Sequence, residues 1–377
     1  MPLYLTDDQI MLKDMVGPML AEDGPKHLRA LRDADDPLGW SRELWARFGA
    51  MGLAGVLVPE AAGGSGLGHV EAGIVLEAAG RNLTPSPFLS TAVAGVTALR
   101  DAGDAVRARW YPGIVAGETT IAIAVDEGAK HRPAATALRA ERSGNGFRLT
   151  GSKQFVVQGG SADLLLVAAR TAGAPGEEAG ITLFAVPRTL DGIEADGARL
   201  ADSGVAARIR FDGVTVDADA VIGEIDGGWA PLSRMLDAGR VGAAAEQLGV
   251  GGAALDMTVD YLKTRKQFGV AIGSFQALQF RAAHLYSELE IARAATLKAQ
   301  QMLDMGDADA SKWAAVAKAK AGAASMLAVQ EGVQMHGGIG MTDAYDIGLY
   351  MKRDRVLQEW FGDAGYQADR LAGMNGF

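Results

Sequence analysis

The chain has 377 residues, of which 49% are hydrophobic and 22% are charged, and this composition is ordinary for a globular protein. It contains no cysteine, which excludes disulfides, iron–sulfur clusters, thiolate zinc sites and a cysteine nucleophile. The formal net charge of −10 argues against a broad nucleic-acid surface, so no nucleic-acid partner is expected.

Targeting, membrane and metal signals are weak throughout the sequence. The opening stretch, MPLYLTDDQIMLKDMVGPML, lacks the basic region and long apolar run of a signal peptide, and no run of about 18 apolar residues occurs. We therefore expect no membrane span and a cytoplasmic location. The five histidines do not pair at metal-ligand spacing, so no metal site is expected.

Residues 1–119 are predicted to form an N-terminal helical domain. Thr6 is a plausible N-cap, because Asp7 and Asp8 follow it and apolar residues then recur at helical spacing from Ile10 to Met19.

Residues 120–228 change character and predict a middle β-domain. The strings TTIAIAV, GFRLTGSKQFVV, DLLLVAA, GITLFAV and ARIRFDGVTV are short and β-branched, and glycine-rich turn signals separate them. No long helical pattern intervenes, which favours an antiparallel β-barrel or sandwich over a Rossmann unit.

Residues 229–377 are helical again and rich in alanine. Long helices are predicted at 229–266, 275–306 and 310–336, with a final helical segment over roughly 344–372. Long helices joined by short loops predict an antiparallel four-helix bundle. The fold class is thus α+β and multi-domain, in the order helices, strands, helices.

Two C-terminal strings carry most of the functional information: YLKTRKQFGVAIGSFQALQ (261–279) and QMHGGIGMTDAYDIGLYMKRDR (334–355). An arginine beside a helix end suits a pyrophosphate, and a glycine cluster lets a ligand approach the backbone. The alternative is that both strings are ordinary helix ends with surface charges, where a glycine caps the helix.

These strings resemble the acyl-CoA dehydrogenase family of flavoproteins. The likeness extends over essentially the whole chain, from GLAGVLVPEAAGGSGLG through the strand-rich middle to RKQFG and QMHGGIG. The resemblance implies FAD as cofactor and an acyl-CoA substrate. It also implies a homo-oligomer, a dimer or tetramer holding FAD across a subunit interface, an electron-transfer flavoprotein as partner, and a role in fatty-acid metabolism.

The resemblance also assigns cofactor-binding residues. Arg265, Gln267 and Phe268 match the family segment that contacts the FAD of a neighbouring subunit, and Arg presents a planar, always-charged fork to phosphate oxygens. A second match, to the family's QxxGG segment, consists of Gln334, Gly337 and Gly338.

The β-domain departs from the family pattern around the flavin. Phe155 stands where the family has a tryptophan that covers the flavin, and Val157 stands where it has a threonine. Phe155 can still stack on a ring. The family's loop before this segment is reduced to VDEGAKHRPAAT, in which Asp126 or Glu127 is the possible remnant.

The expected catalytic base is missing. Phe361 occupies the place of the family's catalytic glutamate, and Gly239 precedes Arg240 where some branches carry that glutamate instead. Asp363 and Asp237 are the nearest candidates for a base, and Asp237 and Arg240 are candidates for substrate contact.

Three hypotheses follow from these departures. The chain is an active acyl-CoA dehydrogenase with its base elsewhere, or it is an FAD-binding partner of a sister subunit that carries the glutamate, as in heteromeric dehydrogenases of steroid thioesters. The third is a flavin oxidase, a monooxygenase or a non-catalytic binder of the same fold, which nothing in the sequence favours.

Overall fold

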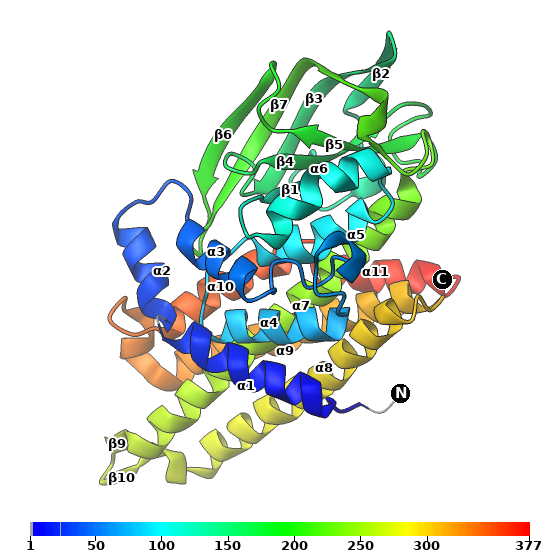
Figure 1. The fold of residues 1–377 in the computed structure, drawn as a ribbon. Helices are drawn as coiled ribbons and strands as arrows, with labels where there is room; N and C mark the ends of the chain where they lie inside the picture. The colour runs from blue at the N-terminus through cyan, green and yellow to red at the C-terminus, as the bar shows by residue number, and fades with distance from the viewer. Residues whose placement is uncertain (1–2, 23) are drawn as a thin grey trace. The chain divides into compact units, whose positions relative to one another are not determined.

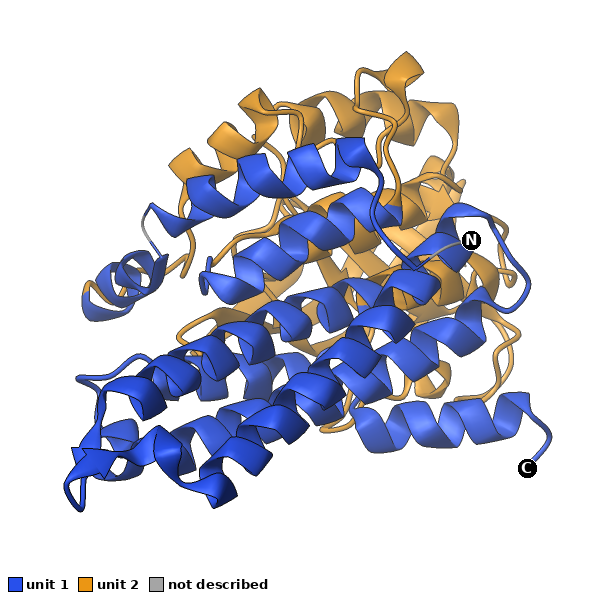
Figure 2. Cartoon of the chain, turned by 90° about the horizontal axis from the view of Figure 1, so that it is seen from below, with its two compact units in different colours: residues 1–33, 69–84, 240–377 blue, residues 34–68, 85–239 orange. Residues whose placement is uncertain are grey.

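A computed structural model describes residues 3–22 and 24–377 (Figure 1). By contacts, the chain divides into two compact units (Figure 2). Unit 1 comprises residues 1–33, 69–84 and 240–377, and unit 2 comprises residues 34–68 and 85–239. This division by contact is separate from the three sequence-based domains, whose boundaries at 119/120 and 228/229 stay a prediction.

Unit 2 combines short helices with a sheet. Its helical segments are α3 (Arg42–Ala50), η1 (Glu60–Ala62), η2 (Leu89–Gly95), α5 (Val96–Leu99), α6 (Asp104–Val115), η3 (Pro133–Ala135) and η4 (Ala218–Ala220). Its strands are β1 (Ile121–Ala124), β2 (Arg139–Ser143), β3 (Gly146–Val157), β4 (Leu164–Arg170), β5 (Ile181–Pro187), β6 (Ile193–Arg199), β7 (Val205–Val216) and β8 (Val221–Ile222).

The strands form one mixed sheet in the order β6-β7-β3-β2-β4-β5-β8, with β1 paired to β4. Most neighbours are antiparallel, as the short alternating strands predict, but β1 and β2 each pair with β4 in parallel. Every residue of β4 is buried, which explains its run of apolar residues. Phe147 and Phe184 meet edge to face in the core, with ring centroids 5.2 Å apart.

Unit 1 is helical apart from one short hairpin (Figure 2). Its helices are α1 (Asp7–Ala21), α2 (Gly24–Asp33), α4 (His69–Arg81), α7 (Trp229–Thr264) from residue 240 onward, α8 (Gln276–Asp304), α9 (Ala310–His336), α10 (Ile347–Glu359) and α11 (Ala364–Met374), with the 3-10 turns η5 (Ile272–Ser274) and η6 (Gly337–Met341). The hairpin is β9 (Lys266–Gln267) with β10 (Val270–Ala271). Helix α9 packs against α8, α10 and α11, while α1 and α8 pack against α4.

The predicted start of α1 is confirmed in detail. The Thr6 hydroxyl accepts a hydrogen bond from the Gln9 backbone N–H at 3.3 Å, and the Gln9 side chain accepts one from the Thr6 N–H at 3.0 Å. Together these two bonds form a capping box, which satisfies two donors that a helix start otherwise leaves without partners. The overall order of helices, strands and helices is confirmed as well.

The final helical segment predicted over roughly 344–372 is present but is divided into two helices. The chain leaves α10 after Glu359 and starts α11 at Ala364. Phe361 and Gly362 have φ values of 63° and 94°, in the left-handed region that interrupts an α-helix. Asp363 then caps α11, because its side chain accepts from the Tyr366 N–H at 2.8 Å.

Glycines let α4 and α7 approach closely within unit 1. A Cβ on Gly80 would lie 2.1 Å from the Glu246 carbonyl oxygen, and one on Gly249 would lie 2.0 Å from the Glu77 carbonyl oxygen. Both obstacles are backbone atoms, which cannot swing aside as a side chain can. The two helices can therefore pack at this separation only while both positions lack a side chain.

We expect Gly249→Ala to destabilise the protein by about 2–3 kcal/mol, because the added methyl group overlaps a helix backbone. Gly252→Ala is the matched control on the same helix. Its Cβ would lie 3.4 Å from the flexible Arg81 side chain, so it should gain about 0.5–1 kcal/mol of helix propensity. Urea unfolding of both variants measures the difference, and equal stabilities would contradict this packing.

Candidate functional site

The turn between α10 and α11 is held by two side chains that reach one carbonyl. The Phe361 carbonyl oxygen accepts hydrogen bonds from Arg240 Nε at 3.2 Å and from Gln367 Nε2 at 2.8 Å. The Phe361 ring is 3% exposed and stacks on Trp360, with ring centroids 5.1 Å apart and planes within 10°. An apolar ring therefore occupies the position that sequence resemblance assigns to a carboxylate.

The two predicted candidates for the base lie on different elements. Asp363 follows the turn directly and is the N-cap of α11, and the neighbouring Tyr366 ring lies under the Arg240 guanidinium at 5.7 Å. Asp237 is 3% exposed and lies on α7, three residues before Arg240. Asp363 is thus part of the turn itself, whereas Asp237 precedes Arg240 on α7.

A buried lysine supports the same turn from α9. Lys318 is fully buried, and its Nζ donates to the Leu357 carbonyl oxygen at 2.8 Å, near the end of α10. Gln358 Nε2 donates to the Gly322 carbonyl oxygen at 2.8 Å. Burial raises the pKa of the nearby Asp354 carboxyl. Lys318 therefore positions the last turn of α10. This role was not predicted, because the alanine-rich sequence around Lys318 carries no motif for it.

The same lysine predicts a pH effect on stability. Burial lowers the pKa of Lys318 from 10.5 to about 8, so between these pH values the unfolded chain binds more protons than the folded one. The charged lysine therefore lowers the free energy of unfolding below pH 8. This free energy rises by on the order of 3 kcal/mol as the pH increases from 8 to 10.5. We expect the free energy of unfolding of the wild type, minus that of Lys318→Met, to rise over this range in denaturant titrations. A difference that does not change with pH would show that the pKa of Lys318 is not lowered in the folded chain.

The first predicted cofactor segment lies at the end of α7 and in the hairpin that follows. Arg265, Gln267 and Phe268 are all exposed, and Phe268 is 90% exposed with a φ of 54°. In the part of the chain that the structure describes, the Arg265 guanidinium has no ion pair or hydrogen bond. An unpaired guanidinium and a solvent-exposed aromatic ring are thus three residues apart on this segment.

The second predicted cofactor segment lies at the end of α9. Gln334, Gly337 and Gly338 are exposed, and a Cβ on either glycine would meet no atom within 4 Å. Gly337 has φ 64° and ψ −142°, a conformation essentially restricted to glycine. The backbone here is therefore open to close approach by another molecule.

An aromatic cluster joins the two segments within unit 1. The rings of Tyr261, His336 and Tyr345 form a triangular cluster, in which the His336 centroid lies 4.5 Å from Tyr261 and 4.7 Å from Tyr345. The ring atom Nδ1 lies 2.6 Å from the Gly332 carbonyl oxygen, and burial lowers the pKa of the His336 imidazole. The ends of α7 and α9 are thereby fixed to each other. A free guanidinium, an exposed ring and open glycine backbone together fit a dinucleotide with its pyrophosphate and its aromatic base.

In unit 2, the other two predicted cofactor residues are Phe155, which lies in a β-bulge of β3, and Val157, which follows it. Lys153 pairs with Ile209 and Val156 with Ala207, so Gln154 and Phe155 together face a single residue of β7. Phe155 is half-buried with a φ of 52°, whereas Val157 is buried and regularly paired. A bulge re-aims a side chain out of the strand alternation, and bulges are frequent beside functional sites.

The loop remnant that the sequence singled out is anchored to the same strand. Lys153 is fully buried, and its Nζ donates to the Val125 carbonyl oxygen at 2.8 Å and to Glu127 Oε1 at 2.7 Å. Burial lowers the pKa of the Lys153 amine. Asp126 Oδ2 lies 2.8 Å from His131 Nδ1. Both carboxylates thus hold the loop in place.

A π-helix in unit 2 was not predicted from the sequence. It covers Leu89–Gly95, and all seven residues are buried. The Ser90 hydroxyl donates to Gln158 Oε1 at 3.1 Å, and the Thr91 hydroxyl accepts from the Ile121 N–H at 2.8 Å. Such wide helical turns are rare and often occur at functional sites. No residue type in this stretch signals one.

Two further findings concern the described residues only. No helix in residues 3–22 or 24–377 is long and apolar enough to cross a membrane. Within the same ranges, no group of three or more histidine or acidic side chains is arranged to hold a metal ion.

Family models match three consecutive stretches of the chain. The acyl-CoA dehydrogenase N-terminal domain matches residues 6–118, the middle domain residues 125–214 and the C-terminal domain residues 226–373.

Known proteins with the same organisation are similar over most of the chain. The acyl-CoA dehydrogenase FadE12 of Mycobacterium tuberculosis is 34% identical over 84% of this chain and 83% of its own. The solved structure of a variant of the Tcur3481-Tcur3483 steroid ACAD is 30% identical over 98% of each chain, with a TM-score of 0.88. The ChsE4-ChsE5 complex of Mycobacterium tuberculosis is 26% identical over the full length of both chains, with a TM-score of 0.89.

Proposed function

This chain belongs to the acyl-CoA dehydrogenase family, and we propose that it introduces an α,β double bond into an acyl-CoA thioester without a carboxylate at position 361. The chain is an FAD-dependent oxidoreductase. The observation that carries the proposal is the match of all three acyl-CoA dehydrogenase domains, in order, along the chain. The buried Phe361 ring, in a turn that Arg240 and Gln367 hold by its carbonyl, is the reason that the base must lie elsewhere in this candidate.

The reaction removes two hydrogens from neighbouring carbons. A carboxylate takes the weakly acidic α-hydrogen as a proton, and hydrogen bonds to the thioester carbonyl stabilise the charge that develops there. FAD, when bound, would supply the acceptor for the β-hydrogen as a hydride. We assign the proton transfer to Asp363 or Asp237, and contact with the substrate to Asp237 and Arg240.

Cofactor binding is assigned to the exposed segments of unit 1 and the bulge of unit 2. Arg265 would pair with the pyrophosphate, beside Gln267 and Phe268, and the open backbone at Gln334, Gly337 and Gly338 would meet the dinucleotide. The ring of Phe155 would stack on the flavin, with Val157 beside it. The solvent-exposed position of the unit 1 residues suits a site completed by another copy of the chain, in a homodimer or homotetramer.

We assign the remaining roles from the family. The electrons would pass to an electron-transfer flavoprotein, and the substrate class is fatty-acid or related lipid thioesters. The absence of cysteine suits a reducing compartment, consistent with a cytoplasmic location.

A second candidate function is that of a partner subunit. A sister chain would carry the glutamate, and this chain would complete its FAD site. The apolar Phe361 favours it, as does the similarity to the Tcur3481-Tcur3483 steroid ACAD and to the ChsE4-ChsE5 complex.

Turnover by the purified chain distinguishes the two candidates. The chain alone, loaded with FAD, is given a panel of acyl-CoA thioesters and an artificial electron acceptor. The first candidate predicts enoyl-CoA formation by the chain alone. Flavin binding without turnover, with activity restored by a co-encoded sister chain, would overturn the first candidate and support the second.

A further inference from the structure

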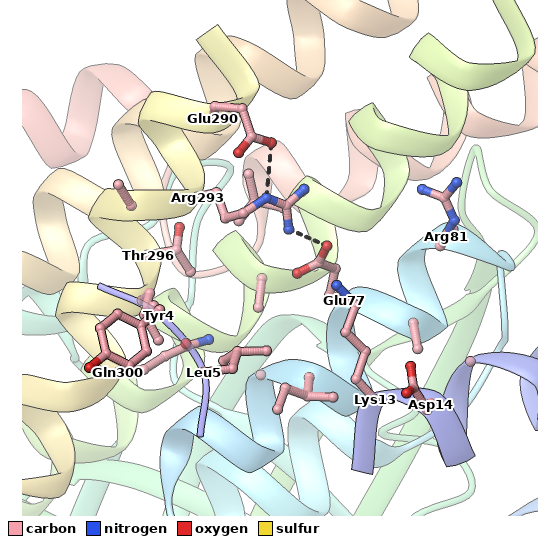
Figure 3. Close-up of a pocket in the computed structure, with 18 of the residues that line it drawn as sticks. Tyr4, Leu5, Lys13, Asp14, Glu77, Arg81, Glu290, Arg293, Thr296 and Gln300 are labelled. Carbon is pink, nitrogen blue, oxygen red and sulfur yellow. Dashed lines mark hydrogen bonds and ion pairs between the residues drawn. The ribbon is translucent and has the colours of Figure 1, made fainter. Parts of the chain in front are cut away.

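Unit 1 contains a cavity whose lining includes none of the residues assigned to catalysis or cofactor binding above (Figure 3). Its volume is about 960 Å³, and its walls come from the chain before α1 and from α1, α4, α7 and α8. Apolar side chains such as Ile74, Leu248 and Leu297 make up much of the lining. A cavity of this size and character is large enough for a small organic ligand.

The charged groups of the cavity are compensated internally. Arg293 pairs with Glu77, and its Nε lies 3.2 Å from Glu290 Oε1; Figure 3 shows this chain of charges across the cavity. Arg81 pairs with Asp256. Lys13 and Asp14, of opposite charge, are neighbours on the exposed side of α1. The lining thus holds three cationic and three anionic side chains, so its net charge favours neither an anion nor a cation.

One deeply buried polar group is left without a partner. Gln300 is 6% exposed and lines the cavity, and its amide makes no hydrogen bond to any residue that the structure describes. Its Nε2 lies against the bare backbone of Gly73, where a Cβ would come within 1.8 Å. The amide is therefore available to a bound molecule, and it pairs best with a group that accepts or donates hydrogen bonds.

We propose that this cavity binds an uncharged, largely apolar molecule carrying a hydroxyl or carbonyl group, which hydrogen-bonds to the Gln300 amide. The apolar walls take the body of the ligand, and the neutral amide selects a neutral polar group. This site is separate from the FAD and acyl-CoA assignments, and it stands whether or not those assignments hold.

The test uses the flavin-loaded full chain and 1-decanol as the probe, with decanoate and decylamine as charged comparisons. Calorimetric titration is expected to show saturable binding of decanol and weaker binding of both ions. Gln300→Leu should weaken decanol binding roughly tenfold, because it removes the amide but keeps the apolar surface. Ala294→Phe should weaken decanol binding, because Ala294 lines the cavity and the new ring would take up part of its space.

Ala295→Phe is the matched control, since Ala295 is half-buried on the same helix and does not line the cavity. It should bind decanol like the wild type. Decanol binding that is unchanged in both Gln300→Leu and Ala294→Phe would place the probe elsewhere and overturn the proposal. No saturable binding to the wild type, which would leave a cavity that holds only water, would overturn it too. Tighter binding of decanoate than of decanol would refute the proposed ligand class.

Discussion

Arg265→Ala is expected to purify with little or no FAD. The Arg265 side chain is exposed and has no partner among the described residues, so it is free to bind a phosphate. Losing a bidentate guanidinium–phosphate contact costs about 3 kcal/mol, which weakens cofactor binding roughly 150-fold. Flavin absorbance per chain, measured after size-exclusion chromatography, gives the occupancy.

Lys266→Ala is the control for this result. Lys266 is the next residue along the chain, is equally exposed and carries the same charge, so its removal alters the local field in much the same way. We expect this variant to retain its FAD, because it keeps the planar guanidinium of Arg265 and loses only the point charge of Lys266. Full flavin occupancy in Arg265→Ala would show that the assignment of Arg265 is wrong.

The second large effect concerns the base. We expect either Asp363→Asn or Asp237→Asn to lower turnover of the chain by about 10²–10⁴-fold, the usual contribution of general base catalysis. Asparagine caps a helix as well as aspartate does, so Asp363→Asn removes the base while keeping the start of α11. Rates with an artificial electron acceptor measure the loss, and circular dichroism checks that the fold persists.

A second substitution makes this test independent of misfolding. Adding Phe361→Glu to the inactive variant should restore part of the activity, because it places a carboxylate where the family has one. The Phe361 side chain is buried, so desolvation should raise the pKa of the new carboxyl and increase its strength as a base. Phe361→Gln in the same background has the same shape but no base, and it should restore nothing. Full activity in both asparagine variants would show that the base is not one of these residues.

The helical framework was predictable because its signals are local. The Thr6 cap followed from a short stretch of sequence, and the long helices α7, α8 and α9 followed from apolar periodicity. The break between α10 and α11 was not predictable, because a phenylalanine at a φ of 63° has no local signature. It is stabilised by Arg240, which lies 121 residues away in sequence.

The residues of the candidate site likewise divide into those that local motifs predict and those that only tertiary packing reveals. Arg265 and Gly337 lie at exposed helix ends that their motifs marked. The contribution of Lys318 depends on the carbonyl of Leu357, 39 residues later, so only the folded chain reveals it. The π-helix over Leu89–Gly95 and the unpaired amide of Gln300 likewise arise from tertiary packing, which no pattern along the chain encodes.

The most direct test of the proposed function is an anaerobic titration of the flavin-loaded wild-type chain with a panel of acyl-CoA thioesters. We expect at least one thioester to remove the absorbance of oxidised flavin, with one equivalent of enoyl-CoA formed for each flavin reduced. A chain that binds its flavin but, by itself, is reduced by none of the thioesters would contradict the proposed function.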